Sequence, residues 1–308
     1  MTHQGQALII NNIMPYAGAK QSVRAILSKL TNEELVGITV QDSLLVTNSK
    51  PDHLNIFIVD NYDARESFKI ALHENSFHII CESNLCPVHA VKSSIRMSRD
   101  SEGFFRDPAN VILPSITKKL ELEIFKETER ATLLQKISDF IVGQSASLNA
   151  QESAQIISTE LLMNVQKDAP LYFSNAYGPA ALEERMAQGV LGSFICAANS
   201  DHLLLCAKDY FGSLDLDKML GRLIETTSSD YARIDANSET EAGLGCRIIY
   251  EHAATFIVGV NIQNWSLVAA TVPLKASRKQ RELIPKNLHF VRFGGQWRRG
   301  WDSNPRAP

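Results

Sequence analysis

A carboxylate and an amide four residues apart are the first residues whose types and spacing suggest chemistry. They are Glu160 and Asn164, the ends of the segment Glu-Leu-Leu-Met-Asn. Residues four apart lie on one face of a helix, so both side chains would point to the same place. An amide oxygen can bind Mg²⁺, and a carboxylate can accept a proton from a hydroxyl nucleophile. Taken alone, the pair is also typical of the surface of an ordinary amphipathic helix.

An acid and a glycine follow an apolar run further along the chain. Asp209 and Gly212 belong to the segment Lys-Asp-Tyr-Phe-Gly-Ser-Leu over residues 208–214. An acid at the end of a strand can accept a hydrogen bond from an adenine amino group. The glycine lets the backbone approach a ligand or adopt a positive φ. Alone, the segment is equally typical of a strand-to-turn junction.

Two glycines, Gly243 and Gly245, lie between a polar loop and an apolar helical pattern. Glycines at the N-terminus of a helix expose backbone N–H groups and the positive end of the helix dipole, which suits a phosphate chain. A single Gly-x-Gly is weak evidence, because tight turns use it too.

In this order, the three segments resemble those of the GHKL (Bergerat-fold) ATPases, including anti-sigma serine kinases and histidine kinases. The segment over 160–164 is similar to the N box of that family, 208–214 to its G1 box and 243–245 to its G2 box. The polar stretch 226–241 lies where the family has its ATP lid. The resemblance covers residues 147–280, under half of the chain, and implies a GHKL ATP-binding domain there.

The resemblance also implies the cofactors ATP and Mg²⁺ and a role for each residue. Glu160 would be the catalytic base, Asn164 the Mg²⁺ ligand and Asp209 the adenine contact. Three glycines would bring backbone close to the nucleotide: Gly212, Gly243 and Gly245.

Two departures from the family pattern bear on function. Phe211 stands where the first glycine of the G1 box belongs, and Ser213 replaces the second. No histidine occurs over 116–142, so autophosphorylation of the histidine-kinase type is not expected. The resemblance then implies a serine kinase that acts on a regulatory protein, such as a sigma factor or an anti-anti-sigma-like protein. The alternative is a non-catalytic pseudokinase scaffold that sequesters a regulator without turning over ATP.

Residues 1–115 alternate strand and helix patterns, which predicts an α/β sheet with parallel strands. The layout resembles a response-regulator receiver domain in degenerate form. Asn11 and Asn12 end the first strand where the family has acids, and Asp60 ends the third at the place of the phosphorylated aspartate. Neutral amides bind Mg²⁺ more weakly than carboxylates. Residues 110–113 are the last short apolar run.

The predicted fold class is therefore α/β, with a receiver-like doubly wound sheet followed by an α/β sandwich whose sheet is mostly antiparallel. Asn149 is expected to cap the helix that carries Glu160, and Pro170 is expected to stop it. The strands expected in the second sheet are 192–197, 202–207, 255–260 and 267–272. The helices expected to pack on it are 216–225 and 247–253.

A connecting amphipathic helix is expected within 116–146, because apolar residues recur in steps of three and four from Ile116 to Ile141. It would pack either on its own chain or on a second copy as a homodimer. Residues 281–308 are expected to form a disordered tail.

Composition limits the classes of partner. The 308 residues include 31 basic and 34 acidic ones and carry a net charge of -3. Such a surface has no basic field for a phosphate backbone, so no nucleic acid is expected. No apolar run approaches the ~20 residues of a membrane span, and the N-terminus lacks the pattern of a signal peptide. A cytoplasmic location is expected.

Overall fold

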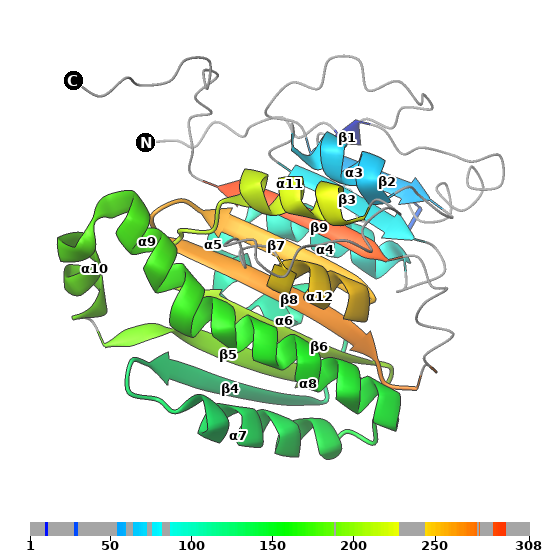
Figure 1. Ribbon diagram of the computed structural model, residues 1–308. Coiled ribbons are helices and arrows are strands. Elements are labelled where there is room, and N and C mark those ends of the chain that lie inside the picture. The colour runs from blue at the N-terminus through cyan, green and yellow to red at the C-terminus, as the bar shows by residue number, and fades with distance from the viewer. Residues whose placement is uncertain are drawn as a thin grey trace.

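The fold is mixed α/β, and its strands form one sheet, most of whose pairs are antiparallel (Figure 1). The computed structural model describes residues 10–11, 28–29, 54–59, 64–72, 76–81, 87–187, 189–227, 244–275, 277 and 286–293. In this part of the chain nine strands follow the order β1-β2-β3-β9-β7-β8-β6-β5-β4. The pairs β1/β2, β2/β3 and β7/β9 are parallel, and the other pairs are antiparallel.

The elements have the following bounds. The strands are β1 (Ile10–Asn11), β2 (Leu54–Val59), β3 (Ser76–Cys81), β4 (Lys118–Phe125), β5 (Val190–Ala198), β6 (His202–Asp209), β7 (Thr255–Asn261), β8 (Trp265–Pro273) and β9 (Asn287–Phe293). The helices are α3 (Ala64–Ala71), α4 (Pro87–Arg99), α5 (Ser101–Arg106), α6 (Pro108–Ile112), α7 (Arg130–Val142), α8 (Leu148–Met163), α9 (Ala169–Tyr177), α10 (Pro179–Met186), α11 (Leu216–Thr226) and α12 (Leu244–His252). A π-helical turn, η1 (Asn164–Asp168), joins α8 to α9.

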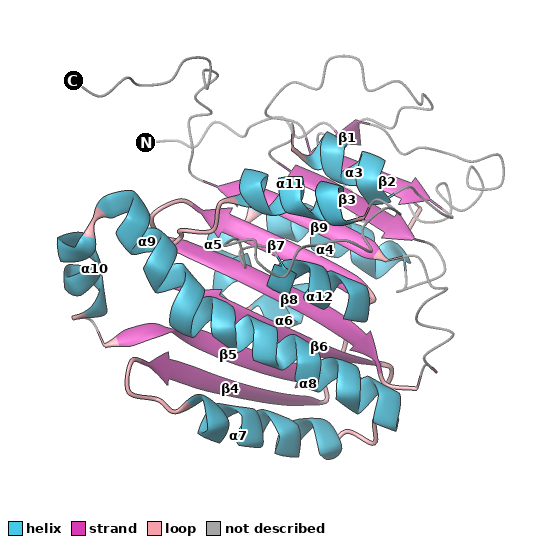
Figure 2. Cartoon of the chain, viewed as in Figure 1, coloured by secondary structure: helices cyan, strands magenta, loops and turns pink. Residues whose placement is uncertain are grey.

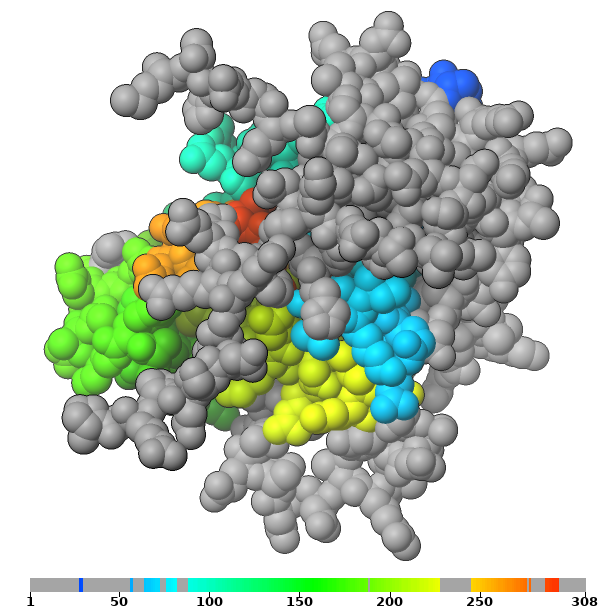
Figure 3. Space-filling view, turned by 90° about the horizontal axis from the view of Figure 1, so that it is seen from above, coloured from blue at the N-terminus to red at the C-terminus, as the bar shows by residue number. Residues whose placement is uncertain are grey.

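Helices cover both faces of the sheet (Figure 2). On one face, α3, α7, α8, α11 and α12 pack over the larger apolar core. On the other face, α4, α5 and α6 pack over a smaller core. Seen from above, α3 and α11 lie side by side on the surface of the first face (Figure 3). The sheet is therefore the middle layer of three, and a site on one face is separated from the other by a single strand thickness.

The central strands are buried on both faces, as their uninterrupted apolar sequences require. In β5 the side chains alternate between the two cores. Phe194 and Cys196 contact the larger core, while Ile195 and Ala197 contact the smaller one. This alternation fixes which residues of each strand face α8, and so which face carries the predicted site.

The segment predicted as one connecting helix contains a strand and a shorter helix, so that prediction is wrong. Residues 118–125 form β4, an edge strand antiparallel to β5, and α7 follows after a turn. The apolar side chains of α7 that are buried, Leu133, Ile137 and Ile141, belong to the larger core of this chain. Of the stripe that suggested a homodimer, Ile124, Ile137 and Ile141 are buried within this chain, whereas Ala131 is exposed.

The prediction of a disordered tail over 281–308 is also wrong for part of that range. Residues 287–293 form β9, which pairs with β3 on one side and β7 on the other. β9 joins strands from residues 1–115 to strands from residues 147–280 in one sheet. The sequence predicted two sheets instead. Residues 294–308 lie outside the described residues.

The receiver-like layout is only partly reproduced. The parallel pairing of β1, β2 and β3 is as predicted. Residues 110–113, predicted as a further apolar run of the sheet, instead lie in and just after the short helix α6, whose Pro108 occupies its first turn. Asn11 lies in β1, whereas Asn12 and Asp60 fall outside the described residues.

Candidate functional site

The helix that leads to Glu160 and Asn164 has its N-cap two residues earlier than predicted. Ser147, and not Asn149, is the N-cap of α8, and its hydroxyl accepts a hydrogen bond from the Ala150 N–H at 3.3 Å. The end of the helix was also predicted wrongly, because Pro170 does not stop it. The chain continues through η1 into α9, where Pro170 occupies the first turn.

The π-helical turn has a direct cause in the sequence. Pro170 has no N–H and cannot donate to the carbonyl of Gln166, so regular α-helical bonding cannot continue there. The helix widens instead, and the Ala169 N–H donates to the carbonyl of Asn164, five residues back. Gln166 holds the turn in place, because its amide accepts from Arg130 and donates to the Thr128 carbonyl.

The structure brings the first and third predicted motifs together. A Cβ built on Gly245 would lie 2.7 Å from Oε2 of Glu160 and 3.7 Å from Oδ1 of Asn164. Gly245 lies in the first turn of α12, directly across from the end of α8. The helix start that was predicted to bind phosphate therefore faces both the carboxylate and the amide. Gly243 lies outside the described residues.

Electrostatics identify further residues around this point. Burial raises the pKa of the Glu160 carboxyl, and the negative charge of Asp168 raises it further. Burial also raises the pKa of the Cys246 thiol to about 12, with added contributions from Asp168 and Glu160. Tyr172, whose pKa is raised by burial and then by Asp168, completes the group. A carboxyl with a raised pKa is a better proton acceptor near neutral pH.

Asp168 and Tyr172 were not predicted as part of the site. They continue the spacing of four from Glu160 and Asn164, and this spacing is the signal that sequence reasoning had available. The assumption that Pro170 ended the helix concealed it. Cys246, the third further residue of this group, is 5% exposed.

The second motif is a tight turn at the end of β6. Asp209 is 8% exposed, and its Oδ1 accepts hydrogen bonds from the N–H groups of Phe211 and Gly212 at 2.9 and 3.0 Å. Burial raises its pKa to about 6, although these bonds and those from Ser266 oppose the rise. The carboxylate that was predicted to contact adenine is thus already hydrogen-bonded within the chain.

Gly212 and Phe211 have structural explanations in this turn. Gly212 has a φ of 58°, and a Cβ there would lie 2.4 Å from the carbonyl oxygen of Asn261. Only glycine fits such a left-handed position pressed against other backbone. Phe211 is 1% exposed, and its ring centroid lies 5.6 Å from that of Phe173 on α9.

The turn contacts the segment that follows the first motif through neighbouring residues. The Ser213 hydroxyl donates to the carbonyl of Ala169 at the start of α9, at 2.8 Å. A Cβ on Gly192, which pairs with Asp209, would meet Val165 in η1 at 2.9 Å. The end of β6 therefore supports the segment that carries Asn164.

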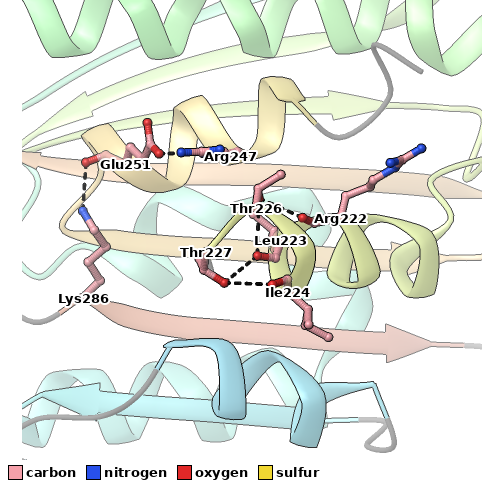
Figure 4. Close-up of polar contacts among 8 residues, drawn as sticks. All are labelled: Arg222, Leu223, Ile224, Thr226, Thr227, Arg247, Glu251 and Lys286. Carbon is pink, nitrogen blue, oxygen red and sulfur yellow. Dashed lines mark hydrogen bonds and ion pairs between the residues drawn. The ribbon is translucent and has the colours of Figure 1, made fainter. Parts of the chain in front are cut away.

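Polar contacts fix the helices on either side of the predicted lid (Figure 4). At the end of α11 the hydroxyls of Thr226 and Thr227 donate to backbone carbonyls of the preceding turn. In α12, Arg247 pairs with Glu251 at 2.7 Å, and Lys286 donates to the Glu251 carbonyl. The lid itself, apart from its first two residues, lies outside the described residues.

No protein-family model matches the sequence, and a comparison with curated proteins finds no match. In the described part of the chain, no helix is long and apolar enough to cross a membrane.

Proposed function

We propose that the chain is a signalling protein that binds Mg-ATP between α8 and α12 and phosphorylates a serine on a regulatory partner protein in the cytoplasm. The observation that carries this proposal is the close approach of Gly245 to the end of α8, because even a Cβ at this position would lie 2.7 Å from Oε2 of Glu160 and 3.7 Å from Oδ1 of Asn164. A helix start with exposed N–H groups beside oxygen ligands is a combination that suits a metal-bound triphosphate.

Each residue of the site has a separate role in this proposal. Glu160 accepts the proton of the serine hydroxyl, which its raised pKa favours. The amide oxygen of Asn164 holds Mg²⁺, and the backbone of Gly243 and Gly245 binds the phosphates. Bound Mg-ATP supplies the phosphoryl group and the positive charge that stabilises its transfer.

One observation favours a second function, that of a scaffold without catalysis. The Asp209 carboxylate accepts bonds from its own turn and from Ser266, and Phe211 fills the space beneath α9. An adenine amino group would compete with these donors. In this alternative the fold sequesters a regulator and does not turn over ATP.

Isothermal titration with Mg-ATP distinguishes the two functions. The kinase predicts saturable binding that Asn164→Ala weakens at least tenfold in the presence of Mg²⁺ and hardly changes in EDTA. Glu160→Gln is expected to keep nucleotide binding and lose phosphoryl transfer, whereas Glu152→Gln, an exposed acid on the same helix, keeps both. Absence of heat at millimolar Mg-ATP leaves only the scaffold.

A further inference from the structure

A cleft of about 590 Å³ lies on the face of the sheet opposite Glu160, where α5 meets the end of β6 and the turn between β7 and β8. Its volume is within the range of sites that bind small molecules. Tyr210 follows β6, and Lys208 precedes Asp209 in that strand, so both point away from the α8 side that Phe211 faces. The cleft is therefore separate from the proposed nucleotide site.

Three aromatic side chains form one wall of this cleft. The rings of Phe105 and Trp265 are stacked, with centroids 4.4 Å apart and planes inclined by 16°. Tyr210 meets Phe105 edge to face at 5.9 Å. Trp265 is 6% exposed, whereas Phe105 and Tyr210 are half-buried, so Phe105 and Tyr210 provide most of the aromatic surface that a planar ligand would contact.

A buried cation lies at the same wall. The side chain of Lys208 is 6% exposed, and its ammonium lies 5.2 Å from the centroid of the Phe105 ring. Its carboxylate partner Glu121 is 3.5 Å away and 42% exposed. Glu121 also pairs with Lys119 at 3.4 Å. Lys119 has a second carboxylate partner, Asp107, at 3.2 Å. Among the described residues Lys208 pairs with Glu121 alone, and this solvated carboxylate at 3.5 Å neutralises the buried ammonium incompletely. An anion in the cleft would therefore be stabilised.

A second cation stands at the rim. Arg106 is exposed, and within the described residues it makes no ion pair, although Glu102 lines the same cleft one helical turn earlier. A guanidinium can bind a carboxylate through two parallel hydrogen bonds. A cationic ligand, in contrast, would meet both Arg106 and Lys208, and Lys208 already occupies the position over the Phe105 ring.

We propose that this cleft is a binding site for a small planar organic anion of the aromatic carboxylate class. The ring lies against Phe105, Tyr210 and Trp265, and the carboxylate faces Lys208 and Arg106. The proposal does not depend on nucleotide binding at the α8 side.

Tryptophan fluorescence tests it with the whole chain. The sequence has three tryptophans, so Trp297→Phe combined with Trp301→Phe leaves Trp265 as the only emitter. Benzoate is expected to change its emission with saturation in the millimolar range or below. Benzamide, which has the same shape without the charge, should bind at least tenfold more weakly, and benzylamine should not bind.

Variants in the same background locate the anion. Lys208→Met should weaken benzoate binding at least tenfold and Arg106→Ala severalfold, while Lys208→Arg and the exposed control Lys218→Met retain it. The comparison of benzoate with benzamide needs no change at Lys208, so it still decides if Lys208→Met fails to fold. A linear, unsaturated response to benzoate, or equal affinity for benzamide, overturns the proposal.

Discussion

Gly245 is the residue at which the smallest chemical change tests the proposed nucleotide site. Gly245→Ala places a methyl group 2.7 Å from Oε2 of Glu160, closer than real contacts allow. Either the carboxylate or the start of α12 must move, and both belong to the site. We expect Mg-ATP affinity to fall at least tenfold, measured by calorimetry.

The control for this variant is Gly221→Ala. Gly221 lies in α11, and a Cβ there would meet nothing within 4 Å. Alanine also favours a helix over glycine by about 1 kcal/mol, so the control should be as stable as the native chain or more so. If both variants bind Mg-ATP as the native chain does, Gly245 does not border the nucleotide.

At the scale of single residues, the sequence predicted which side chains share a helical face, but it did not predict the hydrogen bonds that they make. The spacing of Glu160 and Asn164 predicted that both lie on one helical face, and both side chains approach Gly245. The hydrogen bonds that Asp209 receives from Phe211, Gly212 and Ser266 could not be predicted, because they depend on how the turn after β6 closes. The same acid in a sequence fits an adenine contact or a buried turn equally well.

The start of α8 provides a prediction at the scale of one element. Ser147→Ala removes the hydroxyl that accepts from the Ala150 N–H, and loss of such a cap typically costs about 1 kcal/mol. Asn149→Ala lies inside the first turn and should cost nothing, because alanine is the better helix former. Urea unfolding followed by circular dichroism measures both midpoints. A larger loss for Asn149→Ala would mean that the cap is at Asn149.

Strand β4 shows why one element was predicted as another. Leu120 and Ile124 are four residues apart, which fits a helical stripe, but they are also two steps of a strand with Leu122 between them. The exposed positions between, Glu121 and Glu123, complete a period of two. Over so short a run, the helical spacing of four and the strand spacing of two fit the same apolar residues. Pairing with β5 decides that the segment is a strand. The charges on this edge also discourage pairing with another chain.

At the scale of the whole molecule, a buried histidine pair crosses the seam between β3 and β9. Nδ1 of His78 and Nδ1 of His289 are 2.9 Å apart, and the side chains are also hydrogen-bonded to Ser98 and Ser94. Burial lowers the pKa of His289 to about 3, and burial followed by the neighbouring histidine lowers that of His78. Both are therefore neutral in the folded chain near neutral pH.

This pair predicts a loss of stability in acid. The unfolded chain takes up protons on both histidines below their ordinary pKa of 6.5, while the folded chain does not. The free energy of unfolding should thus fall as the pH drops from about 6.5 toward 3. His289→Gln keeps a polar side chain without the titration. Its urea midpoint should fall less between pH 7 and pH 5 than that of the native chain; an equal fall would exclude the pair as the cause.

The sequence could predict most strands and helices of residues 147–280, since their periods are clear and their turns polar. It could not predict that β1, β2 and β3 share a sheet with them. The single sheet depends on β9, which pairs with both β3 and β7. Strand β3 lies in the first third of the chain, and residues 262–286 separate β7 from β9. No local pattern records such pairing, and the short run 287–293 was read as part of a tail.

The central place of β9 also sets an order of events during synthesis. β3 and β7 emerge from the ribosome well before residues 287–293. Until then, each has one edge without its partner strand β9. Until β9 is made, β3 and β7 would therefore each expose an unpaired edge that is open to pairing with the wrong strand. Of the described strands, β9 is the last to be made, and its pairing closes both edges at once.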